Sequence, residues 1–155
     1  DRSIAGKWLM TEVEFFLQPN LCDELISFCK KKLNDSIKFN KRLILDLSKY
    51  NDNPMIHNII IKYIKLKPRK KLKNIEFAYW PIGESHDWHD DTIYYDVTTI
   101  TYLNNNYKGG ITTVEDYKIN PEKGKICIFN SSKKHKVSIL EEGERFVLLA
   151  WYVNG

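Results

Sequence analysis

The sequence predicts a mainly β fold, a β-sandwich or jelly roll, with two helices covering one outer face. From about residue 73 onward, short alternating segments are separated by clusters of Gly, Asn, Asp and Pro. Two segments with helical spacing precede them. The 155-residue chain has no internal repeat and no low-complexity linker. We therefore expect one domain over residues 1–155, with helical support at about 19–66 and a β core at about 73–153.

The chain is expected to begin with a strand and a helix. Residues 7–16 alternate loosely and are rich in aromatic and β-branched side chains, as in a strand. Pro19 and Asn20 open the first helix, and the cations Lys30–Lys32 suit its last turn. Its apolar positions recur at helical spacing: Leu21, Leu25, Phe28, Cys29 and Leu33.

A second helix is expected from about Pro54 to Ile64. Asn51-Asp52-Asn53 supplies its cap, since short polar side chains can accept hydrogen bonds from the first free N–H groups. Its apolar stripe consists of Ile56, Ile59, Ile60 and Tyr63.

Six strands are expected in the β core. In the first, which starts at Lys73, Ile75, Phe77 and Tyr79 alternate with Asn74, Glu76 and Ala78. The other five are expected at residues 97–103, 110–115, 125–129, 136–140 and 145–153. Their regular spacing, with turn residues between them, is typical of a jelly roll.

Composition excludes some classes of protein. No segment approaches 18 consecutive apolar residues, so we expect no membrane span. Cys22, Cys29 and Cys127 form no CxxC pair and leave one thiol over in any disulfide scheme, which favours a reducing, cytoplasmic compartment. Ile, Asn and Lys fill 51 of 155 positions, as in an A+T-rich genome. We expect the cytoplasm of a microbial cell or, for a viral protein, of its host.

The basic residues are unevenly distributed. Six of them fall within Lys65–Lys73, in a chain of net charge +4. Such a run could guide an acidic partner or nucleic acid, but no aromatic platform or nucleic-acid motif accompanies it. We interpret it as a solvated connection between helix and sheet, and we expect no nucleic-acid partner.

The residues with metal-binding chemistry gather between Tyr79 and Asp91. On an extended backbone alternate side chains share a face, so His89 and Asp91 point together while Asp90 points away. His135 follows the 125–129 strand and a short turn, where a third ligand is expected. Two imidazoles and one carboxylate form the facial triad of non-haem Fe(II) oxygenases, which leaves positions open for a co-substrate and O2.

Arg145 begins the last expected strand, ten residues after His135. The turn 141–144 folds this strand back and brings the guanidinium near the metal cleft, with Trp151 on the same face. Arginine suits bidentate capture of a carboxylate in a partly buried place. The chain has 20 Lys but only 4 Arg, so an isolated arginine in a strand needs an explanation. A dicarboxylate co-substrate provides one; a salt bridge to Glu142 or Glu144 is the alternative.

These landmarks together resemble the 2-oxoglutarate and Fe(II)-dependent dioxygenases, most closely the prolyl 4-hydroxylase branch, which includes the oxygen-sensing prolyl hydroxylases. The resemblance covers about residues 73–153 and continues more weakly through the preceding helices. It implies a double-stranded β-helix, the jelly-roll or cupin-like fold. It rests on Tyr79, Gly83, His89-x-Asp91, Thr101-Tyr102-Leu103-Asn104, Gly109-Gly110, Pro121-x-x-Gly124, Phe129, His135, Gly143-x-Arg145 and Trp151.

The resemblance also implies roles for these residues. His89, Asp91 and His135 would hold Fe(II), and Arg145 would pair with the distal carboxylate of 2-oxoglutarate. Collagen-type relatives have Lys in place of Arg145, which favours the oxygen-sensor and bacterial types. Because halogenating relatives lack the carboxylate that Asp91 supplies, halogenation is disfavoured.

The aromatic residues of the resemblance would line the pocket. Tyr79 and Tyr102 match positions beside the co-substrate, although both could be plain core aromatics. Trp151 matches an aromatic near the substrate entrance. Tyr94 and Tyr95 lie in the loop after the metal dyad, which either closes over substrate or is a plain surface loop.

Three further polar residues are not expected to bind metal. His86 breaks the HxD spacing and is interpreted as a rim or exposed residue. Asp90 is expected to be structural, and His57 to be an ordinary helix residue.

The function that the resemblance implies is hydroxylation of a C–H bond, coupled to conversion of 2-oxoglutarate and O2 to succinate and CO2. Fe(II) would be the metal and ascorbate a reductant. Peptidyl proline is the favoured substrate. Two alternatives stay open: a hydroxylase of a free amino acid or other small molecule, and a cupin-like module that binds metal or ligand without oxidising it.

Overall fold

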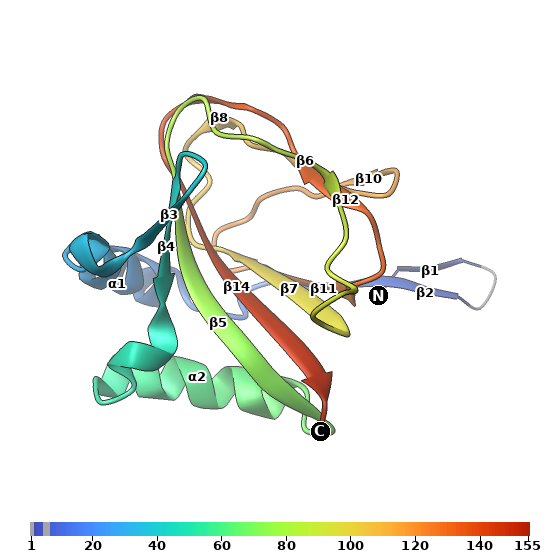
Figure 1. The fold of residues 1–155 in the computed structure, drawn as a ribbon, viewed down its shortest axis with the longest axis horizontal. Coiled ribbons are helices and arrows are strands. Elements are labelled where there is room, and N and C mark those ends of the chain that lie inside the picture. Colours follow the sequence, from blue (N-terminus) through green and yellow to red (C-terminus); the bar gives the residue numbers. More distant parts are fainter. Residues whose placement is uncertain (1, 5–6) are drawn as a thin grey trace.

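The computed structural model describes residues 2–4 and 7–155 and consists mainly of antiparallel sheets with two helices (Figure 1). The large sheet contains, in order, β1 (Arg2–Ile4), β2 (Lys7–Val13), β11 (Ile126–Asn130), β7 (Val97–Tyr102), β14 (Arg145–Asn154), β5 (Lys70–Trp80), β4 (Arg42–Asp46) and β3 (Ile37–Phe39).

A second sheet lies across from the large one (Figure 1). Its order is β10 (Tyr117–Lys118), β9 (Thr112–Val114), β12 (His135–Val137) and β6 (His86–His89). A two-stranded sheet pairs β13 (Leu140–Glu142) with β8 (Lys108–Gly109). The predicted mainly β jelly roll with flanking helices is confirmed.

Both helices, α1 (Pro19–Lys30) and α2 (Pro54–Leu66), cover one face of the large sheet, as predicted (Figure 1). The predicted stripe of α2 is buried in a core that also contains Cys22, Leu25 and Cys29 of α1. From the sheet, alternate residues of β5 and β14 complete this core, including Phe77 and Leu148. Asn53 caps α2 through its side-chain oxygen, which accepts hydrogen bonds from the N–H groups of Met55 and Ile56.

The first strand and first helix are shorter than predicted. β2 ends at Val13, because the chain turns there and Phe15 adopts a left-handed conformation with φ 54°. α1 ends at Lys30, so of the three expected lysines only Lys30 lies in its last turn. Leu33 lies instead in a short 3-10 helix, Leu33–Asp35, where Asn, Asp and Ser residues favour a turn over a continued helix.

The hairpin of β3 and β4 and the 3-10 helix after it, Leu47–Tyr50, were not predicted. Asn40 lies in the turn between β3 and β4 with φ 59°. Asn tolerates this left-handed conformation, which two-residue hairpin turns require. β4 pairs with β5, so the hairpin extends the large sheet at one edge.

Three further expectations need correction. β5 starts at Lys70, so half of the basic run lies inside a strand rather than in a connection. The 110–115 strand begins only at Thr112, because Gly110 is in a left-handed conformation (φ 59°). The 136–140 strand is split between β12 and β13, because Ser138 hydrogen-bonds Ile111 and the chain leaves the second sheet there.

The structure also bears on the expectations from composition. In the described part of the chain, no helix is both long and apolar enough for a membrane span. Cys22, Cys29 and Cys127 are all buried free thiols.

Candidate active site

Two neighbouring strands of the second sheet place two imidazoles side by side. β6 and β12 are antiparallel, and His89 lies directly opposite His135. The Nδ1 atom of His89 lies 2.7 Å from the carbonyl oxygen of Asp87, and that of His135 lies 3.0 Å from the carbonyl oxygen of Lys133. Because a carbonyl only accepts, each Nδ1 carries the proton and each Nε2 keeps a free lone pair, as in metal-binding histidines.

Asp91 reaches the two imidazoles from just beyond the end of β6. Its N–H donates to the carbonyl of Ser131, which holds the chain against the neighbouring turn. Asp91 Oδ2 accepts hydrogen bonds from Thr98 Oγ1 (2.9 Å) and Trp151 Nε1 (3.2 Å), and it lies 3.5 Å from His135 Nε2. Asp91 Oδ1 lies 4.0 Å from His89 Nε2, and no described residue donates a hydrogen bond to it.

The structure thus brings the three predicted ligands together and turns Asp90 away. One nitrogen or oxygen atom from each of His89, Asp91 and His135 lies within 4.8 Å of the others. The exposed Asp90 instead accepts hydrogen bonds from Thr92. Two imidazole nitrogens and one carboxylate oxygen suit a divalent transition metal such as non-haem Fe(II).

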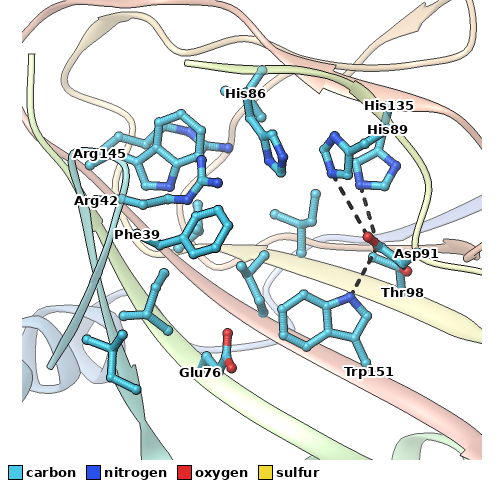
Figure 2. A pocket seen from close by; sticks show the side chains of 17 residues that line it. Phe39, Arg42, Glu76, His86, His89, Asp91, Thr98, His135, Arg145 and Trp151 are labelled. Atoms are coloured by element: carbon cyan, nitrogen blue, oxygen red, sulfur yellow. Dashed lines mark hydrogen bonds and ion pairs between the residues drawn. The ribbon is translucent and has the colours of Figure 1, made fainter. Parts of the chain in front are cut away.

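A cavity of about 380 Å³ contains this triad at one end and Arg145 at the other (Figure 2). Its wall comes from the β3–β4 hairpin and from β5, β6, β7, β12 and β14. The volume is that of a small-molecule site.

Arg145 is the largest fully buried side chain of the described residues, with 1% of its surface exposed. Its Nη2 donates to Thr112 Oγ1 (3.0 Å), and its guanidinium carbon lies 4.6 Å from the centre of the Trp80 ring. Gly110 makes room for it, since a Cβ there would lie 3.0 Å from Arg145 Cδ. The alternative salt bridges are absent among the described residues: Glu142 and Glu144 pair with Lys108 and Lys30 instead.

Unsatisfied polar atoms collect around Arg145. Within the described residues, five buried side-chain nitrogen or oxygen atoms lack a hydrogen-bond partner: Arg42 Nη1, Trp80 Nε1, Tyr102 OH, Tyr107 OH and Arg145 Nε. All can donate a hydrogen bond, and burial raises the pKa of both phenols, so they keep their protons. Buried donors without partners are rare and costly in proteins. Their clustering here fits a site for an anion that accepts hydrogen bonds.

Of the two tyrosines expected beside the co-substrate, the structure brings only Tyr102 to this cluster. The Tyr102 ring lies 5.8 Å from the Arg145 guanidinium carbon. Tyr79 instead packs against Phe146, 5.5 Å between ring centres, on the helix-covered side of the sheet. Strand alternation is the reason, because Trp80, not Tyr79, lies opposite Arg145 in the β5–β14 pair.

The remaining aromatic candidates lie around the triad. Trp151 lines the cavity, and Tyr95 stacks on it with 5.1 Å between ring centres. Tyr94 is exposed and contacts Tyr95.

The other two histidines differ in position. His86 is closer to the triad than expected: it lines the cavity and stacks on His89 at 3.6 Å between ring centres. Burial lowers the pKa of His86 to about 4, so its ring is neutral at pH 7. His57 is exposed on α2 and hydrogen-bonds Asn51.

The polar residues of the site that escaped the sequence analysis include Arg42, Glu84, Thr98 and Thr112. Arg42 could have been found, because the scarcity of arginine that singles out Arg145 applies equally to it. The other three carry no signal of their own, since their roles depend on which strands meet.

Residues 76–153 match the sequence profile described as the 2OG-Fe(II) oxygenase superfamily. The chain is also similar to a PKHD-type hydroxylase of Prochlorococcus marinus (strain NATL1A), with 27% identity over 131 residues. That alignment covers 77% of this chain and 58% of the relative, so the chain spans less than two thirds of the relative's length.

Solved structures with a similar fold include two prolyl hydroxylases. The viral collagen prolyl hydroxylase of Paramecium bursaria Chlorella virus-1, a 2-oxoglutarate complex, has TM-score 0.71 and 17% identity, covering 99% of this chain and 100% of that one. The second is a prolyl hydroxylase from Trichoplax adhaerens in complex with a hypoxia inducible factor peptide fragment. It has TM-score 0.75 and 16% identity, covering 94% of this chain and 83% of that one. At these identities the likeness establishes the fold.

Proposed function

Because the chain belongs to the 2OG-Fe(II) oxygenase superfamily, we propose that it is a dioxygenase that hydroxylates a C–H bond of peptidyl proline. The reaction would consume 2-oxoglutarate and O2 and release succinate and CO2. One observation carries the proposal: a single cavity joins an open His89, Asp91 and His135 triad to a buried arginine that has no carboxylate partner among the described residues.

The triad would hold Fe(II) through the Nε2 atoms of His89 and His135 and through Asp91 Oδ1. The two backbone carbonyls behind the imidazoles fix their tautomers, and Thr98 and Trp151 fix the carboxylate. When bound, the iron with its co-substrate supplies the oxidising chemistry for an unactivated C–H bond. The protein supplies three ligands on one side and leaves the side toward the cavity free.

Arg145 would bind the distal carboxylate of 2-oxoglutarate. Its buried positive charge lacks an anionic partner among the described residues, and its Nε has no acceptor. The phenol of Tyr102 is a second free donor beside it. A carboxylate would satisfy these donors and neutralise the charge, which is what burial of a guanidinium requires.

A peptide substrate is supported by the apolar rim of the cavity. Ile37 and Phe39 lie exposed on the hairpin side of the mouth, and Ile93 and Tyr94 lie exposed in the loop after Asp91. Exposed apolar surface at the mouth of a pocket is typical of an interaction site. Trp151, Tyr94 and Tyr95 would contact the substrate there. The two prolyl hydroxylases of similar fold are named for proline substrates, which points in the same direction.

The test is an assay with Fe(II), 2-oxoglutarate and ascorbate in air, with proline-containing peptides in one arm and free L-proline in the other. We expect succinate together with a peptide that has gained the mass of one oxygen atom. His89→Ala and Arg145→Ala should abolish both products, whereas the matched control His57→Ala should retain them. Oxygen gain by free proline alone would identify a small-molecule hydroxylase. Metal and 2-oxoglutarate binding without succinate would identify a non-catalytic module. Omitting ascorbate tests whether it is the reductant.

A further inference from the structure

A second arginine lies at the same end of the cavity as Arg145. Arg42 is the first residue of β4, has 6% of its surface exposed and lines the cavity together with Phe39 and Ile44 of the same hairpin. Figure 2 shows Arg42 and Arg145 at the end of the cavity remote from Asp91. The hairpin at the edge of the large sheet therefore contributes a second cation to the site.

Arg42 and Arg145 share one aromatic ring. The guanidinium carbon of Arg42 lies 4.9 Å from the centre of the Trp80 ring, and that of Arg145 lies 4.6 Å from it. Phe39 contacts Arg42 from the hairpin at 5.2 Å. Cation–π contacts of this kind hold both guanidiniums in place. They leave the N–H groups, which lie in the plane of each guanidinium, free to bind a ligand.

Glu84 does not satisfy the Arg42 guanidinium. Its carboxylate is fully buried and already accepts four hydrogen bonds, from the Asn40 side chain and from the N–H groups of Lys41, Arg42 and Ser85. The Arg42 Nη1 atom lies 3.8 Å from Glu84 Oε2, within the range of an ion pair but beyond hydrogen-bond distance, and no described residue accepts a hydrogen bond from it. Glu84 therefore fixes the hairpin turn and the position of Arg42, but leaves the buried Nη1 without an acceptor.

The charges at this end of the cavity do not balance. Two buried guanidiniums face one buried carboxylate, so one positive charge is uncompensated. Burial lowers the pKa of Arg42, Glu84 raises it, and the neighbouring positive charge of Arg145 lowers it. An anion bound at this end of the cavity would relieve the repulsion between the guanidiniums and satisfy N–H groups that lack an acceptor.

We propose that Arg42 is a second guanidinium of the co-substrate site, where its Nη1 donates to the distal carboxylate of 2-oxoglutarate beside Arg145. Glu84 is the positioning residue that holds Arg42 in this place. The inference rests on the proposed function, since it concerns the same co-substrate. It makes the β3–β4 hairpin part of the active site.

Calorimetric titration of 2-oxoglutarate into the Mn(II)-loaded protein tests this proposal without catalysis. Arg42→Met keeps the length of the side chain but removes its charge and donors, and it should weaken 2-oxoglutarate binding about tenfold or more, as for a lost charge-assisted hydrogen bond. Glu84→Gln should weaken it by less. Mn(II) binding should be unchanged in both variants. The matched control is Arg69→Met, which removes an exposed arginine outside the cavity and should bind as wild type does.

A second ligand separates direct contact from a general disturbance of the site. 2-Oxobutanoate lacks the distal carboxylate, so its weaker binding to the Mn(II)-loaded protein should be the same in wild type, Arg42→Met and Glu84→Gln. Equal losses for both ligands would overturn the proposal in favour of a structural role. If Arg42→Met fails to fold, Arg42→Gln provides the same comparison, because its polar amide suits the site but carries no positive charge.

A failure of this inference and a failure of the proposed function give different results in the titration. If wild type binds 2-oxoglutarate and Arg42→Met binds it equally well, the inference is wrong and the proposed function stands. If the metal-loaded wild type binds no 2-oxoglutarate, both are wrong.

Discussion

The two ends of the cavity differ in what they lack. At the metal end, hydrogen bonds to backbone carbonyls, Thr98 and Trp151 hold the imidazoles and the carboxylate so that His89 Nε2, His135 Nε2 and Asp91 Oδ1 stay free. At the arginine end lie the five buried donors without partners. One end is a set of acceptors that a cation would complete, and the other is a set of donors that an anion would complete.

This difference shows why one small dicarboxylate could use the whole cavity. Its 2-oxo acid group can bind a metal, and its distal carboxylate can satisfy the buried donors. Each end should therefore fail separately when it is mutated. Substitutions at Asp91, Arg145 and Thr98 test that separation, from the largest expected effect on binding to the smallest.

The largest effect is expected at Asp91. Asp91→Ala removes the only carboxylate ligand of the triad and should abolish Mn(II) or Fe(II) binding, measured by calorimetry under anaerobic conditions. Asp90→Ala, the neighbouring control, should leave most of the binding, because Asp90 is turned toward Thr92. Equal losses in both variants would contradict the placement of the dyad.

Arg145→Met should act on the opposite end alone. Loss of the proposed carboxylate partner should weaken 2-oxoglutarate binding by about 100-fold, while Mn(II) binding is unchanged. Because the change also removes an uncompensated buried charge, the thermal stability of the ligand-free protein should be retained or increased. A parallel loss of metal affinity would show that the two ends are not independent.

A smaller loss of metal affinity is expected from a change at Thr98, which contacts the ligand Asp91 from β7. Thr98→Val keeps the shape of the side chain but removes the hydroxyl that donates to Asp91 Oδ2. Metal affinity should fall about tenfold, as for other residues that orient a ligand. The control is Thr99→Val, since Thr99 donates to the backbone carbonyl of Ala150 instead. If both valines bind Mn(II) as wild type does, Thr98 does not orient the carboxylate.

The smallest effect on ligand binding is expected in the cavity wall away from both ends, where a change should alter the stability of the fold instead. Burial, with the nearby Asp46 charge adding to it, raises the pKa of Glu76 from 4.5 to about 7. The folded protein thus binds this proton more tightly than the unfolded chain does, so stability should fall as the pH rises from 4.5 to about 7 and stay lower above it.

Glu76→Gln removes this titration. Relative to wild type, it should gain about 2 kcal/mol in free energy of unfolding at pH 8 and nothing near pH 4. Urea denaturation at both pH values measures the difference. A gain that is the same at both pH values would rule out titration of Glu76 as the cause.

The metal end was predictable because its signal is local. His89 and Asp91 are two residues apart, so an extended backbone points both side chains the same way, and His135 lies just past the expected 125–129 strand. β6 itself ends at His89, and the hydrogen bond from the Asp91 N–H to the Ser131 carbonyl holds the second ligand in place. The supporting contacts of Thr98 and Trp151 come from β7 and β14, and they become visible only when the sheets are assembled.

The arginine end was predictable only in part. Arg145 was found because arginine is scarce, but Arg42 was missed because its strand was missed: the hairpin turn at Asn40 contains no glycine to mark it. Tyr79 was placed in the pocket instead of Trp80 because both faces of β5 are buried near its end. Alternation then identifies two faces but does not tell which one meets the cavity.

A crystal structure with Mn(II) and 2-oxoglutarate tests the division of the cavity most directly. We predict an anomalous Mn(II) peak about 2.0–2.3 Å from the Nε2 atoms of His89 and His135 and from Asp91 Oδ1. The same map should show the distal carboxylate of 2-oxoglutarate hydrogen-bonded to Arg145. Metal bound away from the triad, or a distal carboxylate that points away from Arg145, would contradict the assignment of one end to a cation and the other to an anion.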